Sequence, residues 1–180
     1  MEVISTEIEG LVILKPKVFR DERGYFAETY NAREFRNAMG FDVDFVQDNQ
    51  ARSCYGVLRG LHFQKGEHAQ AKLVRVTEGR VLDVAVDLRP DSPTFGRHVA
   101  VELSSDNFLQ LFIPRGFAHG YAVLSETAVF QYKTDNFYCP DAEGAVLWND
   151  PELAIDWQLP ERDIILSEKD RKNSGFKTLF

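Results

Sequence analysis

Cysteine is scarce in this chain: among its 180 residues only Cys54 and Cys139 occur, and neither belongs to a CxxC pair. Two such residues make no disulfide framework, and in a reducing compartment we expect free thiols. Long apolar runs are also missing, whereas a membrane span needs roughly 20 such residues. The first residues, MEVISTEIEG, lack the basic and then apolar form of a signal peptide. We therefore expect a cytoplasmic protein with no membrane partner.

The chain has no excess of basic residues, since 21 Lys and Arg face 28 Asp and Glu, for a net charge of −7. A surface that follows the phosphates of a nucleic acid needs an overall or regional basic excess, so nucleic acid is not an expected partner. A small anionic ligand remains open, because a few converging Arg and Lys side chains suffice to bind one pyrophosphate.

Internal repeats, low-complexity tracts and linker-like segments are absent as well. A chain of this length buries enough surface for one stable core. We therefore treat residues 1–180 as a single domain.

Short apolar or alternating runs, separated by turn residues at spacings of about ten, dominate the chain from residue 43 to residue 147. This spacing is typical of an antiparallel sandwich or barrel. The predicted strands lie within residues 45–51, 56–64, 71–79, 80–89, 96–104, 108–114, 116–125 and 127–134. The fold class is therefore all-β.

Helix signals are few and short. In NAREFRNAMG, Asn31 can cap, Glu34 completes a capping box and Gly40 ends the helix. Near the C-terminus, NDPELAIDW begins with a capping Asp150, and LSEKDRKN offers another capping box. We expect short peripheral helices around the β domain.

Polar residues interrupt the apolar strands in GVLRGLHFQKGEHAQAKLVRV, residues 56–76. By alternation, His62 shares a face with Leu58, and Arg59 points to the other side. Lys72 is costly to bury and is poorly explained by packing alone. A barrel interior that presents a few such groups would form a small-molecule pocket. A single His or Tyr on an inner strand face can equally be a core residue with one hydrogen-bond partner.

A metal site is a further possibility. PRGFAHG has the spacing PxGxxH, which resembles the second motif of the cupin barrels. The first cupin motif supplies HxH and a glutamate, but here His62 is followed by Phe63 and Gln64. A set of His62, His68 and His119 has suitable ligand types, although its spacing is broken.

Six ordered segments carry a more specific resemblance: residues 19–30, 45–64, 71–79, 112–121, 132–157 and 166–170. Along nearly its whole length, the chain resembles the dTDP-4-dehydrorhamnose 3,5-epimerase family. The resemblance implies a cupin jelly-roll β-barrel and epimerisation of dTDP-4-dehydro-6-deoxy-D-glucose at carbons 3 and 5 in dTDP-rhamnose biosynthesis. It also implies a homodimer that uses no metal or other cofactor.

The resemblance assigns roles to particular residues. His62 matches the general base, Tyr132 the acid on the opposite face, Lys72 the residue at the keto oxygen, and Asp170 the carboxylate that orients the histidine. The positions that match nucleotide and sugar binding are Phe19, Arg23, Glu28, Gln47, Asp48, Asn49, Arg59, His119, Tyr138, Glu143 and Lys169.

These residue types suit the chemistry. The 4-keto group acidifies the protons on both neighbouring carbons, so epimerisation needs a base, an acid and a group that holds the enolate oxygen. Imidazole titrates near neutrality, which suits a base. For Asp170, a capping box begun by Ser167 is an alternative explanation, and Glu28 and Glu143 could be solvated surface charges.

Other functions also remain open from the sequence. A relative that epimerises only one carbon would carry the same catalytic set. A metal-dependent cupin oxygenase and a non-catalytic sugar-binding cupin are the alternatives from other classes.

Overall fold

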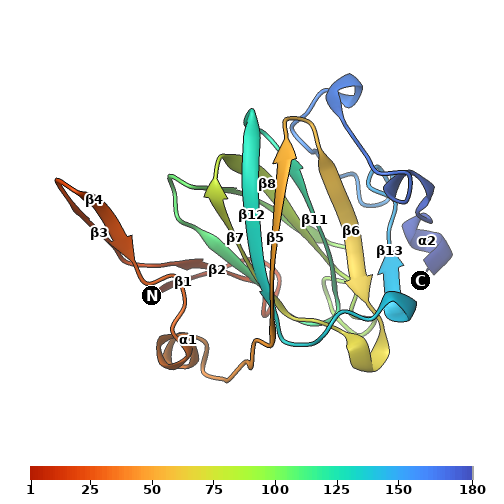
Figure 1. Cartoon of the computed structure of the whole chain (residues 1–180). Coiled ribbons are helices and arrows are strands. Elements are labelled where there is room, and N and C mark those ends of the chain that lie inside the picture. The colour runs from red at the N-terminus through yellow and green to blue at the C-terminus, as the bar shows by residue number, and fades with distance from the viewer. Residues whose placement is uncertain (180) are drawn as a thin grey trace.

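The computed structural model describes residues 1–179, which form two antiparallel sheets that face one another and a separate hairpin (Figure 1). The first sheet has six strands in the order β1 (Glu2–Ser5), β2 (Val12–Lys15), β10 (Gln110–Ile113), β7 (Lys72–Glu78), β12 (Thr127–Thr134) and β5 (Gln47–Cys54). The second has five, in the order β13 (Glu143–Ala145), β6 (Leu58–Gln64), β11 (Phe117–Val123), β8 (Arg80–Asp87) and β9 (His98–Ser104). The hairpin pairs β3 (Val18–Asp21) with β4 (Gly24–Ala27).

The main core lies between the two sheets. It contains Val74 and Phe130 from the six-stranded sheet and Val81, Ala85 and Tyr121 from the five-stranded sheet. A second core covers the outer face of the five-stranded sheet, where Leu153 and Trp157 of the C-terminal segment pack. Both faces of that sheet are therefore buried. The predicted all-β jelly roll with short peripheral helices is confirmed.

The helices are short and peripheral. They are α1 (Ala32–Met39), α2 (Phe176–Leu179) and the 3₁₀ turns η1 (Gly66–His68), η2 (Pro140–Ala142), η3 (Glu161–Asp163) and η4 (Asp170–Lys172). The Asn31 side chain caps α1, and Gly40 ends it in a left-handed conformation at φ 78°, as predicted. Within residues 1–179, no helix is both long and apolar enough to cross a membrane.

One predicted helix is a turn. Residues 151–153 make a single turn closed by a hydrogen bond from the Ala154 amide to the Asp150 carbonyl. Asp150 does cap this turn, because its Oδ1 accepts from the Glu152 amide at 2.9 Å. Its Oδ2 accepts from the Phe176 amide, and Ala154 has φ 47°, so the chain leaves the helical path there.

Candidate active site

A cavity of about 500 Å³ opens between the two sheets. It is lined mainly by residues that face inward from β5, β6, β7, β11 and β12, and by the C-terminal segment over residues 165–170. The lining includes the four predicted catalytic residues, His62, Lys72, Tyr132 and Asp170, together with the predicted binding residues Arg59, His119 and Lys169. One cavity thus brings together much of the predicted site.

Arg59 and His62 both face this cavity, although simple alternation predicts opposite sides. In the pairing of β6 with β11, Arg59 stands opposite Tyr121 and His62 opposite His119. Two residues separate Arg59 from His62 on β6, but only Gly120 separates their partners on β11. This bulge returns both side chains to the inner face. A Cβ on Gly60 would lie 2.5 Å from the Gly120 Cα, so the close approach requires glycine.

His62 is held by a carboxylate. Its Nε2 donates to Asp170 Oδ1 at 2.6 Å. Asp170 is buried, and its amide also donates to the Ser167 hydroxyl, which in turn donates to Asp170 Oδ2 at 2.9 Å. Burial by itself raises the pKa of Asp170, but the bonds from His62 and Ser167 hold that pKa below its usual range. One buried carboxylate thus bonds both His62 and the Ser167 hydroxyl.

Lys72 is the first residue of β7 and enters the cavity from the six-stranded sheet. Burial lowers the pKa of Lys72 to about 8, while the charges of Asp83 and Glu143 oppose that decrease. Near neutral pH its ammonium is therefore mostly charged, yet poorly solvated. Such a cation suits an oxyanion that forms beside it.

Tyr132 faces His62 across the gap between the sheets, because it belongs to β12 and His62 belongs to β6. Burial raises the pKa of Tyr132, and Arg59 opposes this effect. The phenol therefore keeps its proton over the ordinary pH range and can act as a donor.

His119 is buried in the wall of the cavity and makes its contact with a second carboxylate. Its Nε2 donates to Asp83 Oδ1 at 2.8 Å. Burial lowers the pKa of His119, and the charge of Asp83 only partly offsets this effect. We did not predict a role for Asp83 from the sequence; the available signal was an acid inside the apolar run RVLDVAVDL.

Four further predicted residues form a hydrogen-bonded rim with Lys169 near the cavity. Tyr138 donates its hydroxyl to Glu143 Oε2 at 2.6 Å, and Lys169 donates to the same oxygen. The Tyr138 amide donates to the Gln47 side chain, whose amide donates to Asn49. Burial raises the pKa of Glu143, but the bonds from Lys169 and Tyr138 keep it below its usual range. The Tyr138 ring is half exposed and free to stack on a base.

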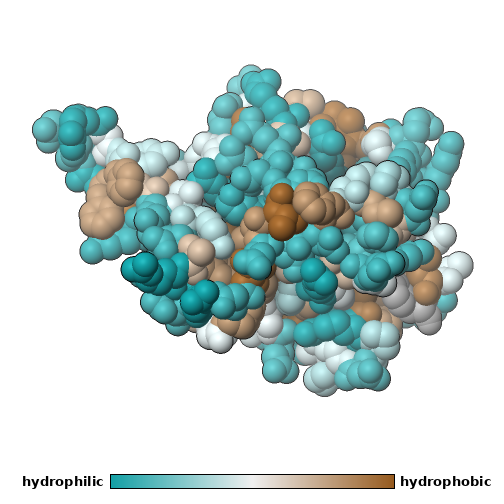
Figure 2. Space-filling view, turned by 60° about the horizontal axis from the view of Figure 1, so that its bottom comes forward, coloured by the Kyte–Doolittle hydropathy of each residue, from teal (hydrophilic) through white to brown (hydrophobic). Residues whose placement is uncertain are grey.

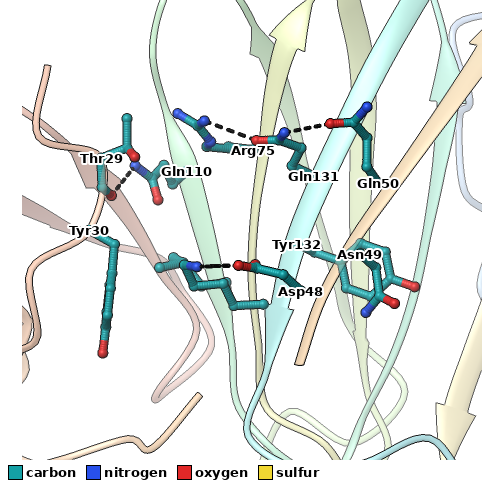
Figure 3. A pocket seen from close by; sticks show the side chains of 11 residues that line it. Thr29, Tyr30, Asp48, Asn49, Gln50, Arg75, Gln110, Gln131 and Tyr132 are labelled. Atoms are coloured by element: carbon teal, nitrogen blue, oxygen red, sulfur yellow. Dashed lines mark hydrogen bonds and ion pairs between the residues drawn. The ribbon is translucent and has the colours of Figure 1, made fainter. Parts of the chain in front are cut away.

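Asp48 lies on the opposite side of the six-stranded sheet. Figure 3 shows it extending from β5 into a separate cavity of about 370 Å³, where its carboxylate accepts from Lys133 at 2.8 Å. Gln50, Arg75 and Gln131 join the same outer surface. The Asp48 side chain is therefore not brought to the cavity that holds His62.

Phe19, Arg23 and Glu28 also lie away from that cavity. Phe19 and Arg23 belong to the β3–β4 hairpin, and Glu28 follows it directly. The hairpin projects from the body in Figure 1, and hydrophobic residues are visible on the same projection in Figure 2. Phe19, Tyr25 and Phe26 are 51%, 59% and 67% exposed. Within one chain, these predicted binding residues do not line the site.

The three histidines considered for a metal are not assembled. His68 lies on η1 near Glu67, whereas His62 and His119 each bond to their own aspartate. Within residues 1–179, no group of three or more His, Cys, Asp and Glu side chains is placed to hold a metal ion.

Comparison with known proteins gives one consistent result. The family model described as dTDP-4-dehydrorhamnose 3,5-epimerase matches residues 5–178. The enzyme of that name from Escherichia coli K12 is 56% identical over 173 residues, covering 96% of this chain and 92% of its own. A crystal structure of the enzyme from Elizabethkingia anophelis NUHP1 has 58% identity and a TM-score of 0.95, covering 99% and 97% of the two chains.

A further solved structure carries a ligand. It is a dTDP-6-deoxy-D-glucose-3,5-epimerase from Legionella pneumophila Philadelphia 1 in complex with dTDP-4-keto-L-rhamnose. Its sequence is 47% identical, its TM-score is 0.95, and the match covers 99% of this chain and 94% of that one. This chain therefore belongs to the dTDP-4-dehydrorhamnose 3,5-epimerase family.

Proposed function

We propose that this isomerase converts dTDP-4-dehydro-6-deoxy-D-glucose into dTDP-4-dehydro-L-rhamnose by inverting carbons 3 and 5. The observation that carries the proposal is the placement of His62, Lys72 and Tyr132 around one cavity. A base, a cation and a proton donor are the three groups that an enolate mechanism requires. The family membership supports the substrate class.

His62 is the proposed base. The ketone at carbon 4 acidifies the protons on carbons 3 and 5, and the imidazole removes one of them in each epimerisation. The carboxylate of Asp170 accepts from His62 Nε2 and stabilises the imidazolium that forms. This contact leaves Nδ1 as the nitrogen that takes the proton.

Lys72 is the proposed partner of the enolate oxygen. Removal of a proton moves negative charge onto the oxygen at carbon 4, and an ammonium in a poorly solvated cavity stabilises that charge strongly. Burial in the cavity wall lowers the pKa of Lys72 to about 8, because the buried ammonium is weakly solvated.

Tyr132 is the proposed acid. Inversion requires that the proton return to the opposite face of the carbon. His62 and Tyr132 come from opposite sheets, so a sugar ring bound between the sheets presents one face to each of them. The proton lost to His62 and the proton given by Tyr132 leave the oxidation state unchanged, so the reaction needs no redox cofactor.

The dTDP group is proposed to bind along the rim. Arg59 and Lys169 supply positive charge for the pyrophosphate. Tyr138 supplies an aromatic face for the thymine, beside Gln47, Asn49 and Glu143. His119 contacts the sugar from the cavity wall.

We also propose that the enzyme is a homodimer in which each hairpin completes the site of its partner. Phe19 and Arg23 stand on a hairpin with exposed aromatic side chains that reaches away from its own cavity. Such a projection suits an exchange between two copies related by two-fold symmetry. Glu28 and Asp48 are then expected at or near the same interface.

The identity of the product tests this function. Incubation of the purified protein with dTDP-4-dehydro-6-deoxy-D-glucose should give a sugar inverted at carbons 3 and 5 by proton NMR. A product inverted at one carbon would instead identify a single-site epimerase. Unchanged substrate would contradict the proposal.

A further inference from the structure

Asp83 is a carboxylate buried inside the wall of the active-site cavity. It lies in β8 among apolar side chains and has 0% of its surface exposed. In the register of β8 with β11 it stands opposite Tyr121, which lines the cavity, so it faces the space between the sheets. Removing a carboxylate from water is unfavourable unless partners compensate. Its position therefore requires a physical reason.

A comparison within the same strand shows that Asp83 does not serve the fold as Asp87 does. Asp87 is equally buried, and its two oxygens accept side-chain bonds from Arg89, Ser92 and Thr94, which close the turn after β8. Asp83 accepts at Oδ1 from His119 alone, and within residues 1–179 its Oδ2 has no hydrogen-bond partner. A carboxylate placed only for stability would be expected to be better satisfied.

The bond to Asp83 selects one form of His119. An ionised carboxylate can only accept a hydrogen bond, so the neutral imidazole carries its proton on Nε2 and leaves Nδ1 as an acceptor. Burial lowers the pKa of His119, which favours this neutral form. His119 lines the cavity, so the fixed tautomer determines what it offers a bound sugar.

Asp83 also acts on Lys72 through its charge. Burial lowers the pKa of Lys72, and Asp83 is the largest influence that opposes this, followed by Glu143. The other charged or titratable groups around the cavity come from every neighbouring element and are Arg59, His62, His119, Tyr121, Tyr132, Lys169 and Asp170. Two acids, Asp83 and Glu143, act on Lys72. Glu143 is also bonded to the Lys169 ammonium, whereas Asp83 accepts from the His119 imidazole.

We propose that Asp83 is a positioning residue of the reaction: it fixes His119 in the Nε2–H tautomer and supplies the negative charge that keeps the Lys72 ammonium in the cavity. Its single bond to His119 and its unpartnered second oxygen follow from these two tasks. The consequence for catalysis rests on the proposed epimerase function, because Lys72 holds the enolate oxygen there.

Two NMR measurements without substrate test the structural part. In the wild-type protein, nitrogen-15 spectra should show His119 protonated at Nε2; protonation at Nδ1 alone would overturn the first task. In the Asp83→Asn variant, the carbon-13 titration of Lys72 should move to lower pH, and an unchanged titration would overturn the second task. If this variant does not fold, Asp83→Glu replaces it, because it keeps the charge. Lys72 should then titrate near the wild-type midpoint, and a midpoint shifted to lower pH would overturn the second task.

Kinetics test the consequence. Asp83→Asn should lose roughly tenfold in kcat/KM at about pH 8, and less as the pH falls, because a more acidic Lys72 becomes charged again. The Asp87→Asn variant is the control: it should lower stability without moving the Lys72 titration. An equal loss at every pH would contradict the proposal. Absence of turnover in the wild type would contradict the epimerase function instead, while the NMR readings would still decide the role of Asp83.

Discussion

His62 and Tyr132 divide the proposed proton transfers between two sheets. Both residues belong to strands that pack into the cores of the two sheets, so the distance between base and acid is set by core packing and not by a loop. The bulge between the His62 and Arg59 pairings turns Arg59 toward the same space and so adds a cation to it.

Replacing Tyr132 by Phe should separate the two halves of the reaction. His62 can still remove the substrate proton, but the donor on the opposite face is lost, so formation of inverted product should fall by about 10²-fold or more. Product NMR and deuterium incorporation measure the two halves separately. Tyr55→Phe removes a surface hydroxyl bonded to Asp163 and is the matched control. Full product formation by Tyr132→Phe would exclude the phenol as the acid.

Lys72 should set the alkaline limit of activity. Its pKa is lowered to about 8 by burial, so the ammonium is lost, and with it kcat/KM, as the pH rises through that value. A pH profile should show this limb in the wild type. Lys133→Met, which removes a lysine from the outer face of the same sheet, should leave the midpoint unchanged. A flat profile to about pH 10 would contradict the role of Lys72.

The sequence pattern identified the cavity residues better than it identified their orientation. Alternation placed His62 among inward-facing candidates, and the cost of burying a lysine drew attention to Lys72, but alternation separated Arg59 from His62. The missing information was the bulge opposite Gly120, which depends on a backbone contact between distant strands. The role of Asp83 was missed for a related reason, because its partner His119 is 36 positions away.

At the scale of elements, the turn that joins β8 and β9 has its own anchor. Asp87 ends β8 and accepts bonds from Arg89, Ser92 and Thr94 on the connection that follows. The Arg89 guanidinium also lies 4.7 Å from the centre of the Phe117 ring. One buried carboxylate thus organises a turn next to the core.

Asp87→Ala should destabilise the protein by about 3 kcal/mol at neutral pH, because donor groups on three residues lose a buried acceptor. Burial raises the pKa of Asp87, but these bonds outweigh it and hold the pKa below the usual 3.8. The stabilisation is therefore complete above about pH 4 and is lost as the pH falls toward the lower folded-state pKa. Urea unfolding at several pH values measures this. A difference from wild type that stays constant down to about pH 2 would contradict it.

The strands β5–β12 were predictable, whereas the N-terminal strands were not, although β2 buries Leu14. The eight predicted runs correspond to β5–β12, whose alternation or apolar content reflects burial. All four residues of β1 are exposed, and β3 and β4 form a projecting hairpin, so no buried face marks them in the sequence. Local cap signals predicted α1 correctly but also suggested a helix where Asp150 caps only one turn.

At the scale of the whole molecule, the cavity of one chain lacks several of the binding residues that the sequence predicts for it. The hairpin carries Phe19 and Arg23 away from the cavity, with exposed aromatic side chains that an isolated chain leaves in water. A single sequence cannot show whether a binding residue serves its own chain or a partner, since both give the same pattern.

Mixed dimers test the exchange of hairpins. The Phe19→Ala/Arg23→Ala variant and the His62→Ala variant should each be nearly inactive alone. After unfolding and refolding together, they should recover roughly a quarter of wild-type activity, because half of the dimers are mixed and each holds one intact site. No recovery, with both variants folded and dimeric, would place the hairpin in its own chain's site or outside the function.

The most direct test of the central claim is solvent deuterium exchange into dTDP-4-dehydro-6-deoxy-D-glucose. The wild-type protein is predicted to introduce deuterium at both carbon 3 and carbon 5, and His62→Ala at neither, since the base that forms the enolate is missing. Exchange at neither carbon by the wild type, or undiminished exchange at both by His62→Ala, would contradict the account.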